Sequence, residues 1–255
     1  MAEWVRDHYV ELLKELPNFK NGNFKEALEE SFLKVDEAIS TAEGNRQLQT
    51  YSSEDSAPTW GMQSDMIANS VGCTAVVALV TPSEIFVANA GDSRCVVSQK
   101  HAAKEMSTDH KPENPEEKTR IEKAGGFVED NRVKGILNLS RSLGDMEYKQ
   151  DSSLPAEKQM LVAFPEVRTI ARSPDLDFMI LACDGIWDCM TSQECVDYVH
   201  EDLAKNEANT GYKTSAVIAK MFEKNIAEEI HTSSKPLTSD GIGCDNMTCT
   251  IVRFK

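Results

Sequence analysis

The chain has 255 residues, 40% of them hydrophobic, and its 27 basic against 42 acidic residues give a formal net charge of -15. This length and apolar content predict one domain, residues 1–255, with a substantial core, because no Gly/Ser-rich or Pro-rich stretch marks a linker. The negative charge repels phosphate backbones and anionic lipid, which argues against nucleic-acid binding and against binding to a membrane surface. We expect a monomer.

The cysteine pattern bears on the compartment. The seven cysteines are an odd number, contain no Cys-x-x-Cys pair and mostly interrupt apolar runs, where free thiols pack as small hydrophobes. Residues 1–7 lack the apolar core of a signal peptide, and no apolar run approaches the length that spans a bilayer. We therefore expect a reducing compartment, the cytoplasm, with the nucleus as the open alternative.

The first third of the chain predicts helices and then a long loop. Residues 3–16 and 24–40 have helical periodicity, and Asn23-x-x-Glu26 resembles a capping box at the start of the second helix. Residues 41–70 are polar with little periodicity, so we expect a flexible loop there.

From residue 71 the pattern changes to short β-branched runs. Residues 74–80, 84–90 and 94–99 are separated by turn residues and predict a meander of antiparallel strands. Proline at the first helical position and a Gly-Gly stop predict a short helix at 115–124. Further strands are expected near 127–129, 132–139, 160–163, 166–172, 177–183 and 247–254, and helices at 191–205 and 213–230. Strands and helices in separate blocks predict an α+β fold.

Three aspartates, Asp92, Asp184 and Asp245, each lie where an apolar run meets a tight turn. Strand-end carboxylates of this kind deliver hard oxygen ligands to a divalent cation. Asp188 follows Asp184 by four residues, so one helical turn would place both carboxylates on one side. The alternative interpretation is a turn or cap residue, and Asp92 in particular could accept from Arg94 or from backbone groups of its own turn.

These segments, together with the strings at 108–112 (Thr-Asp-His-Lys-Pro) and 140–145 (Ser-Arg-Ser-Leu-Gly-Asp), resemble the metal-dependent serine/threonine protein phosphatases of type 2C, in register from about residue 4 to residue 254. The resemblance implies two packed antiparallel β-sheets flanked by helical layers, an α-β-β-α sandwich, with a flap-like region at 110–136. It implies dephosphorylation of phosphoserine and phosphothreonine in protein substrates by a metal-activated water. The cofactors would be two Mg²⁺ or Mn²⁺ ions.

The same resemblance assigns the metal ligands. Asp184 and Asp245 would bind the first metal, and Asp92, Asp184 and Asp188 would form a weaker third site beside it. The family's first strands, one of which ends in Asp-Gly-His-Gly-Gly, have no counterpart in this sequence, which contains no His-Gly pair. They would supply the bridging aspartate, the phosphate-binding arginine and the general-acid histidine. No catalytic side chain is therefore identified, and impaired catalysis is expected.

Two alternatives follow from that difference. The chain could be a family member without catalysis that binds phosphoproteins, or Met1 could reflect an incomplete start, so that the biological protein carries the usual opening. Several neighbouring residues are expected to be structural. We expect Asp109 and Asp145 to orient loops, with Arg141 as a candidate partner, and His110 to hold its turn by a hydrogen bond. Cys183, Cys244 and Trp187 are expected to pack.

Overall fold

The computed structural model describes residues 1–51, 67–209, 211–226 and 242–254. The chain divides into two compact units, and each is described by itself. The first unit comprises Met1–Val80, Phe86–Asp92 and Asp109–Arg168, and the second comprises Thr81–Ile85, Ser93–Thr108 and Thr169–Lys255. The predicted single-domain organisation stays a prediction.

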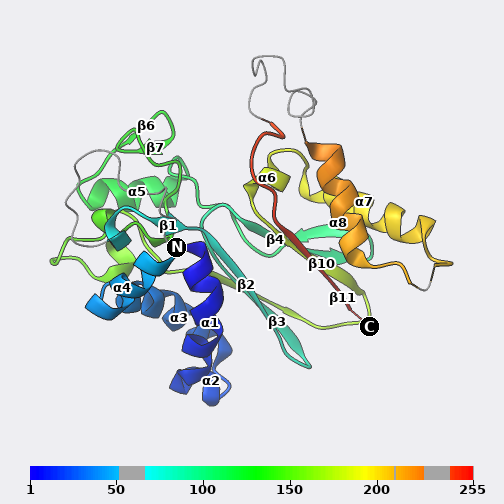
Figure 1. The fold of residues 1–255 in the computed structure, drawn as a ribbon, viewed down its shortest axis with the longest axis horizontal. Coiled ribbons are helices and arrows are strands. Elements are labelled where there is room, and N and C mark those ends of the chain that lie inside the picture. Colours follow the sequence, from blue (N-terminus) through cyan, green and yellow to red (C-terminus); the bar gives the residue numbers. More distant parts are fainter. Residues whose placement is uncertain (52–66, 210, 227–241, 255) are drawn as a thin grey trace. The chain divides into compact units, whose positions relative to one another are not determined.

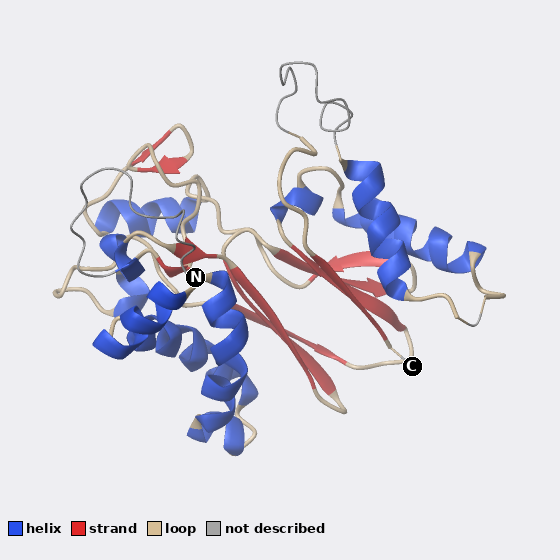
Figure 2. Ribbon diagram, in the orientation of Figure 1, coloured by secondary structure: helices blue, strands red, loops and turns tan. Residues whose placement is uncertain are grey.

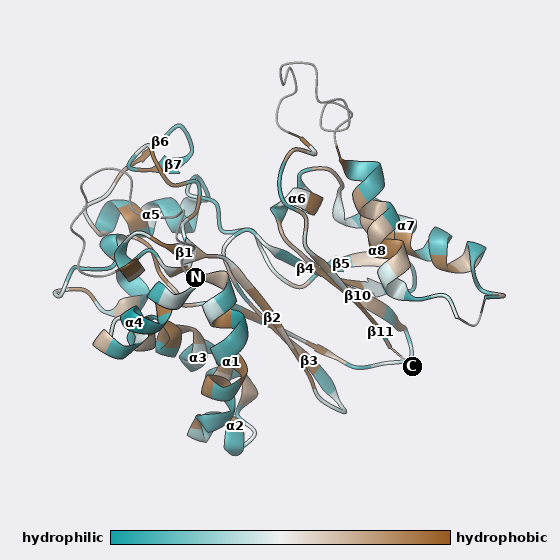
Figure 3. Ribbon diagram, viewed as in Figure 1, coloured by the Kyte–Doolittle hydropathy of each residue, from teal (hydrophilic) through white to brown (hydrophobic). Residues whose placement is uncertain are grey.

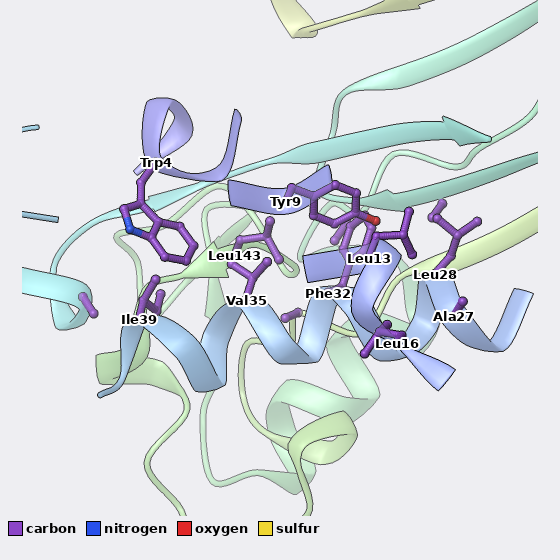
Figure 4. Close-up of a cluster of buried hydrophobic side chains, with 14 of the residues drawn as sticks. Trp4, Tyr9, Leu13, Leu16, Ala27, Leu28, Phe32, Val35, Ile39 and Leu143 are labelled. Carbon is purple, nitrogen blue, oxygen red and sulfur yellow. The ribbon is translucent and has the colours of Figure 1, made fainter. Parts of the chain in front are cut away.

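The first unit opens with helices: α1 (Ala2–Glu15), α2 (Pro17–Lys20), α3 (Phe24–Ile39) and α4 (Ala42–Thr50). The apolar face of α3 carries Leu28, Phe32, Val35 and Ile39, all fully buried, and meets Tyr9 and Leu13 of α1 (Figure 4). This agrees with the two helices predicted from periodicity at 3–16 and 24–40, because a stripe of this kind must be covered by another element.

Two details of this region differ from the prediction. The loop expected over 41–70 is wrong for 42–50, where Thr41 caps helix α4 by accepting a hydrogen bond from the Gly44 N–H. The 3-10 turn η2 (Ile67–Asn69) occupies the end of the same stretch, while the predicted loop at 52–66 lies outside the described residues. Asn23 makes no side-chain cap hydrogen bond to α3, so the capping box expected there is absent.

The remaining elements of this part of the chain are short, apart from one sheet. Strands β2 (Ala75–Val80), β3 (Glu84–Ala90) and β9 (Glu166–Ala171) form a sheet in the order β2-β3-β9. The other elements are the pairs β1 (Gly72–Cys73) with β8 (Leu143–Gly144) and β6 (Val128–Glu129) with β7 (Arg132–Val133), helix α5 (Pro115–Lys123), and the 3-10 turns η3 (Met146–Tyr148) and η4 (Ala156–Lys158). The strand expected at 132–139 is reduced to β7, and 160–163 contributes only a bridge from Val162 to Arg141.

The second unit is built on an antiparallel sheet in the order β11-β10-β4-β5 (Figure 2). Its strands are β11 (Cys249–Arg253), β10 (Leu176–Ala182), β4 (Arg94–Gln99) and β5 (Ala102–Glu105), and its helices are α6 (Asp184–Trp187), α7 (Ser192–Lys205) and α8 (Thr214–Asn225). Helices α7 and α8 combine hydrophobic and hydrophilic positions (Figure 3). Their apolar residues Val196, Val199, Val217 and Met221 join one buried cluster with the strand residues Val96, Phe178, Ile180 and Ile251.

The predicted meander is wrong in its last step, because β3 and β4 belong to different sheets. The chain leaves the first sheet at Gly91, which has a φ of +118° and packs so closely on Thr74 that a Cβ would overlap the threonine side chain. The α+β class with antiparallel sheets and separate helices is confirmed. Among the described residues, no helix is long and apolar enough to cross a membrane.

Candidate metal centre

In the second unit, the ends of two neighbouring strands bring Asp184 and Asp245 to the same edge of the sheet. Strand β10 ends at Ala182, which is paired with Cys249 at the start of β11. Beyond that pair, the Cys183 N–H donates to the Thr248 carbonyl (3.2 Å) and the Thr248 N–H donates to Cys183 Sγ (3.1 Å). The segments that carry Asp184 after β10 and Asp245 before β11 therefore leave the sheet side by side.

A glycine allows the two segments to approach further. A Cβ on Gly185 would overlap the carbonyl oxygen of Asn246, so only glycine fits between the start of α6 and the segment before β11. Cys183 Sγ also donates to that carbonyl (3.2 Å). Asp184 Oδ1 accepts from the Gly185 N–H (3.0 Å), and Asp245 Oδ1 accepts from the Asn246 N–H (2.6 Å). Each carboxylate is thus oriented by the N–H group of its own successor.

Asp188 lies one helical turn beyond Asp184, since its N–H donates to the Asp184 carbonyl (2.8 Å), and its side chain is exposed. Trp187 fixes this turn: its indole N–H donates to the Ala182 carbonyl (2.7 Å), and the Arg94 guanidinium lies 5.1 Å from its ring centroid. Trp187 is 8% exposed and packs in the cluster under α7, as expected.

The donor set fits a hard divalent cation in its chemistry. Mg²⁺ is bound in proteins by one or two carboxylates and keeps several water ligands, which suits the pair formed by Asp184 and Asp245. Over the described ranges, no three side chains of His, Cys, Asp or Glu lie close enough together to enclose a metal ion. The described residues therefore form no closed cage for a metal ion.

Asp92 belongs to the first unit, where its carboxylate is paired with a lysine. Its carboxylate is 4% exposed and forms an ion pair with Lys111 Nζ, whereas Arg94, the partner considered from the sequence, donates to Ser192 Oγ (3.0 Å). Lys111 lies in the Thr-Asp-His-Lys-Pro string, but nothing in the sequence assigns it to Asp92. The preceding residue, His110, is buried and its ring contacts the backbone of Gly91, in agreement with a histidine that holds a turn.

A family model for protein phosphatase 2C matches residues 1–234 of the chain. The chain belongs to the protein phosphatase 2C family. Curated relatives include probable protein phosphatase 2C 2 of Paramecium tetraurelia, 42% identical over 100% of this chain and 79% of that protein. Another is probable protein phosphatase 2C 60 of Arabidopsis thaliana, 52% identical over 76% of this chain and 51% of that protein. The predicted family is therefore confirmed.

Solved structures of the family share the fold. The crystal structure of serine-threonine phosphatase 2C from Toxoplasma gondii matches with a TM-score of 0.71 at 21% identity, covering 100% of this chain and 80% of that chain. A likeness at this identity supports the fold. The activity class of the chain, a protein serine/threonine phosphatase, follows from its membership of the protein phosphatase 2C family.

In the region expected to be flap-like, this phosphatase 2C chain carries a buried polar network that the sequence did not predict. Glu117 of α5 is 4% exposed and accepts from Arg141 Nη2 (2.6 Å), Arg120 Nη1 (2.7 Å) and Ser140 Oγ (2.6 Å). Ser140 Oγ contacts the His110 carbonyl at 2.9 Å. The network thus ties the flap helix to the loop that carries His110 and Lys111.

The network also corrects one predicted pairing. Arg141 pairs with Glu117 and donates to the Phe164 carbonyl (3.1 Å), whereas Asp145 accepts from Ser142 Oγ (2.6 Å). Two features of α5 could have suggested Glu117 as a partner, its position in the first turn of a helix and its i, i+3 spacing to Arg120. Neither feature identifies an arginine 24 residues away.

Proposed function

We propose that this chain hydrolyses phosphoserine and phosphothreonine in protein substrates, using Mg²⁺ or Mn²⁺ held by Asp184 and Asp245. The observation that supports this most is the pairing of the β10 and β11 ends, because Asp184 follows β10, Asp245 precedes β11, and each carboxylate accepts from the N–H of its own successor. Membership of the protein phosphatase 2C family supports the substrate class.

The residues of the chain have distinct tasks in this proposal. A bound divalent cation supplies positive charge against phosphoryl oxygens and lowers the pKa of water. Asp184 and Asp245 hold the cation, and Asp188 lies one turn beyond Asp184 with its side chain exposed. The close contact of Gly185 with Asn246 keeps the two segments together. Asp92 belongs to the first unit, where it is paired with Lys111.

Phosphate release from a phosphothreonine peptide tests the proposal. We expect turnover with Mn²⁺ and none with EDTA. In Asp184→Asn we expect the turnover rate to fall by about 10²-fold or more, because substituting a metal ligand lowers activity more than substituting a residue that only orients a ligand. Asp197→Asn, which changes an exposed carboxylate on α7, is the matched control and should retain activity. Equal turnover by Asp184→Asn and the control, or no turnover from the folded wild-type chain, would contradict the proposal.

We further infer that the chain works as a monomer on phosphorylated proteins in the cytoplasm. All seven cysteines are free, which supports a reducing compartment. Burial raises the pKa of both Cys95 and Cys195 to about 12, so these thiols stay protonated and unreactive. Fluorescence microscopy of the tagged chain, and its elution volume in size-exclusion chromatography, test location and monomeric state.

A further inference from the structure

One face of the flap helix α5, which Figure 1 labels, borders a small basic cavity in the first unit. Four of its helix positions repeat at i, i+3, i+4 and i+7 and therefore lie on one stripe. The cavity has a volume of about 410 Å³ and is lined by Glu116, Thr119, Arg120 and Lys123 of α5, together with Leu154 and Lys158. A volume of this size is within the range of about 300–1,000 Å³ that is usual for ligand pockets.

The cavity is positively charged in a strongly acidic protein. Three cations and a single carboxylate, Glu116, line it, although the chain as a whole carries a net charge of -15. Lys123 and Lys158 are exposed, and across the described part of the chain neither ammonium group has a carboxylate within 4 Å. The other lysines of α1, α3, α5 and α7 all have such a partner, for example Lys118 with Glu122 on the same helix.

Arg120 adds a positive charge to the cavity lining, and its ion pair with Glu117 does not fully neutralise that charge. Its guanidinium is 13% exposed and shares the carboxylate of Glu117 with Arg141, so two guanidinium groups face one carboxylate. Burial and, to a smaller extent, the charge of Arg141 lower the pKa of Arg120, while the charge and hydrogen bond of Glu117 raise it. Within the described residues, Arg120 Nε has no hydrogen-bond partner.

We propose that this cavity is an accessory site for a phosphate group. It would hold a second phosphate on a multiply phosphorylated protein substrate, a step that rests on the proposed function. A phosphate dianion suits one guanidinium and two ammonium groups, since charge-assisted hydrogen bonds from Arg and Lys are about twice as strong as neutral ones. The alternative is that these basic side chains have only a structural role, because basic residues in the last turn also stabilise the carbonyl end of α5.

The first test needs no catalysis. The ¹⁵N-labelled chain is titrated with inorganic phosphate in EDTA, at constant ionic strength, so that binding at a metal centre is removed. We expect saturable amide shifts around Thr119, Lys123 and Lys158. These shifts should be lost in the double variant Lys123→Gln/Lys158→Gln and kept in Lys118→Gln, the control on another face of α5. A linear response, or the same shifts in the double variant, would overturn the site.

The second test connects the site to substrates. We compare a phosphothreonine peptide with one that carries an additional phosphoserine. For the wild-type chain we expect about tenfold lower KM with the second phosphate. In the double variant this difference should disappear, while KM and kcat for the singly phosphorylated peptide stay unchanged. An equal KM for both peptides in the wild-type chain would overturn the substrate assignment.

The two tests separate the accessory site from the proposed function. If neither peptide is turned over while the phosphate titration saturates, the phosphatase proposal fails and the phosphate site stands. If both peptides are turned over while the titration is linear, the proposed function stands and the site fails. Thermal melting of the double variant without phosphate measures the helix-stabilising role, which alone would leave the KM ratio of the two peptides unchanged.

Discussion

At the scale of single residues, the first unit depends on charges that are buried in pairs. Lys149 Nζ donates to Asp36 Oδ2 (2.6 Å) and to the Ser142 carbonyl (2.7 Å), and Asp36 Oδ1 accepts from the Gly144 N–H (2.8 Å). The side chains of Lys149 and Asp36 are 5% and 12% exposed. This pair ties α3 to the segment that carries the Ser-Arg-Ser-Leu-Gly-Asp string.

Lys149→Met should therefore destabilise the chain. Burial already raises the pKa of Asp36 with the lysine in place, and removal of the partner leaves the carboxyl group without compensation. Breaking a buried pair costs about 3–5 kcal/mol of unfolding free energy. Urea denaturation measures it, and Lys14→Met, which opens an exposed pair on α1, should cost less than about 1 kcal/mol. A loss as small as that control's would refute the structural role of Lys149.

Two buried titratable groups predict loss of stability in acid. Burial and the charge of Arg141 lower the pKa of His110 from 6.5 to about 4. Because the unfolded histidine binds a proton first, its contribution falls as the pH drops from 6.5 to 4. Burial would raise the pKa of Glu117, but its bonds to Arg141 and Arg120 outweigh burial and lower it from 4.5 to about 2. Its contribution is present above pH 4.5 and lost toward pH 2.

Chemical denaturation at a series of pH values measures both effects. The unfolding free energy should decline continuously below pH 6.5. In His110→Gln the slope between pH 6.5 and 4 should become shallower, while the decline below pH 4.5 remains. An unchanged slope in the variant would show that His110 titrates alike in the folded and unfolded states.

At the scale of elements, the junction of β10, α6 and β11 depends on Gly185, because a glycine has no side chain. Gly185→Ala would place a Cβ on the Asn246 carbonyl oxygen, which forces the start of α6 away from the segment before β11. We expect a loss of about 1–3 kcal/mol in unfolding free energy, as for other overpacked sites, together with weaker Mn²⁺ binding. Gly211→Ala, whose Cβ would meet only an Asn209 side-chain oxygen at 3.5 Å, is the control. Wild-type stability of Gly185→Ala would contradict the close packing of this junction.

The elements that the sequence predicted well are those whose pattern is complete within the element. Helices α1, α3 and α7 have apolar stripes, and β10 and β11 are short, mostly apolar runs, so local periodicity was sufficient. Helix α4 was missed because Ala42–Thr50 is polar and contains a glycine, so that only the Thr41 cap marks it. The capping box was predicted at the wrong helix. The structure has a complete capping box at Thr191 and Glu194, at the start of α7.

At the scale of the whole molecule, long-range pairing limits what a sequence predicts. Strand-end positions predicted Asp184 and Asp245 as ligands, and in the structure Asp184 begins α6 directly after β10 while Asp245 lies in the segment before β11. The partners of other charged groups, such as Lys111 for Asp92 and Glu117 for Arg141, are set by packing between distant segments and leave no periodic signal. The transfer of β4 to a second sheet has the same origin, because a turn sequence does not reveal which strand the chain joins next.

The proposed phosphatase activity depends on a divalent cation bound where β10 ends and β11 begins. Electron paramagnetic resonance of free Mn²⁺ during titration of the chain counts bound ions without any need for turnover. We predict saturable binding to the wild-type chain that weakens by about tenfold or more in Asp184→Asn and in Asp245→Asn and is unchanged in Asp197→Asn. Equal Mn²⁺ affinity in all four proteins would show that these two aspartates do not hold the metal.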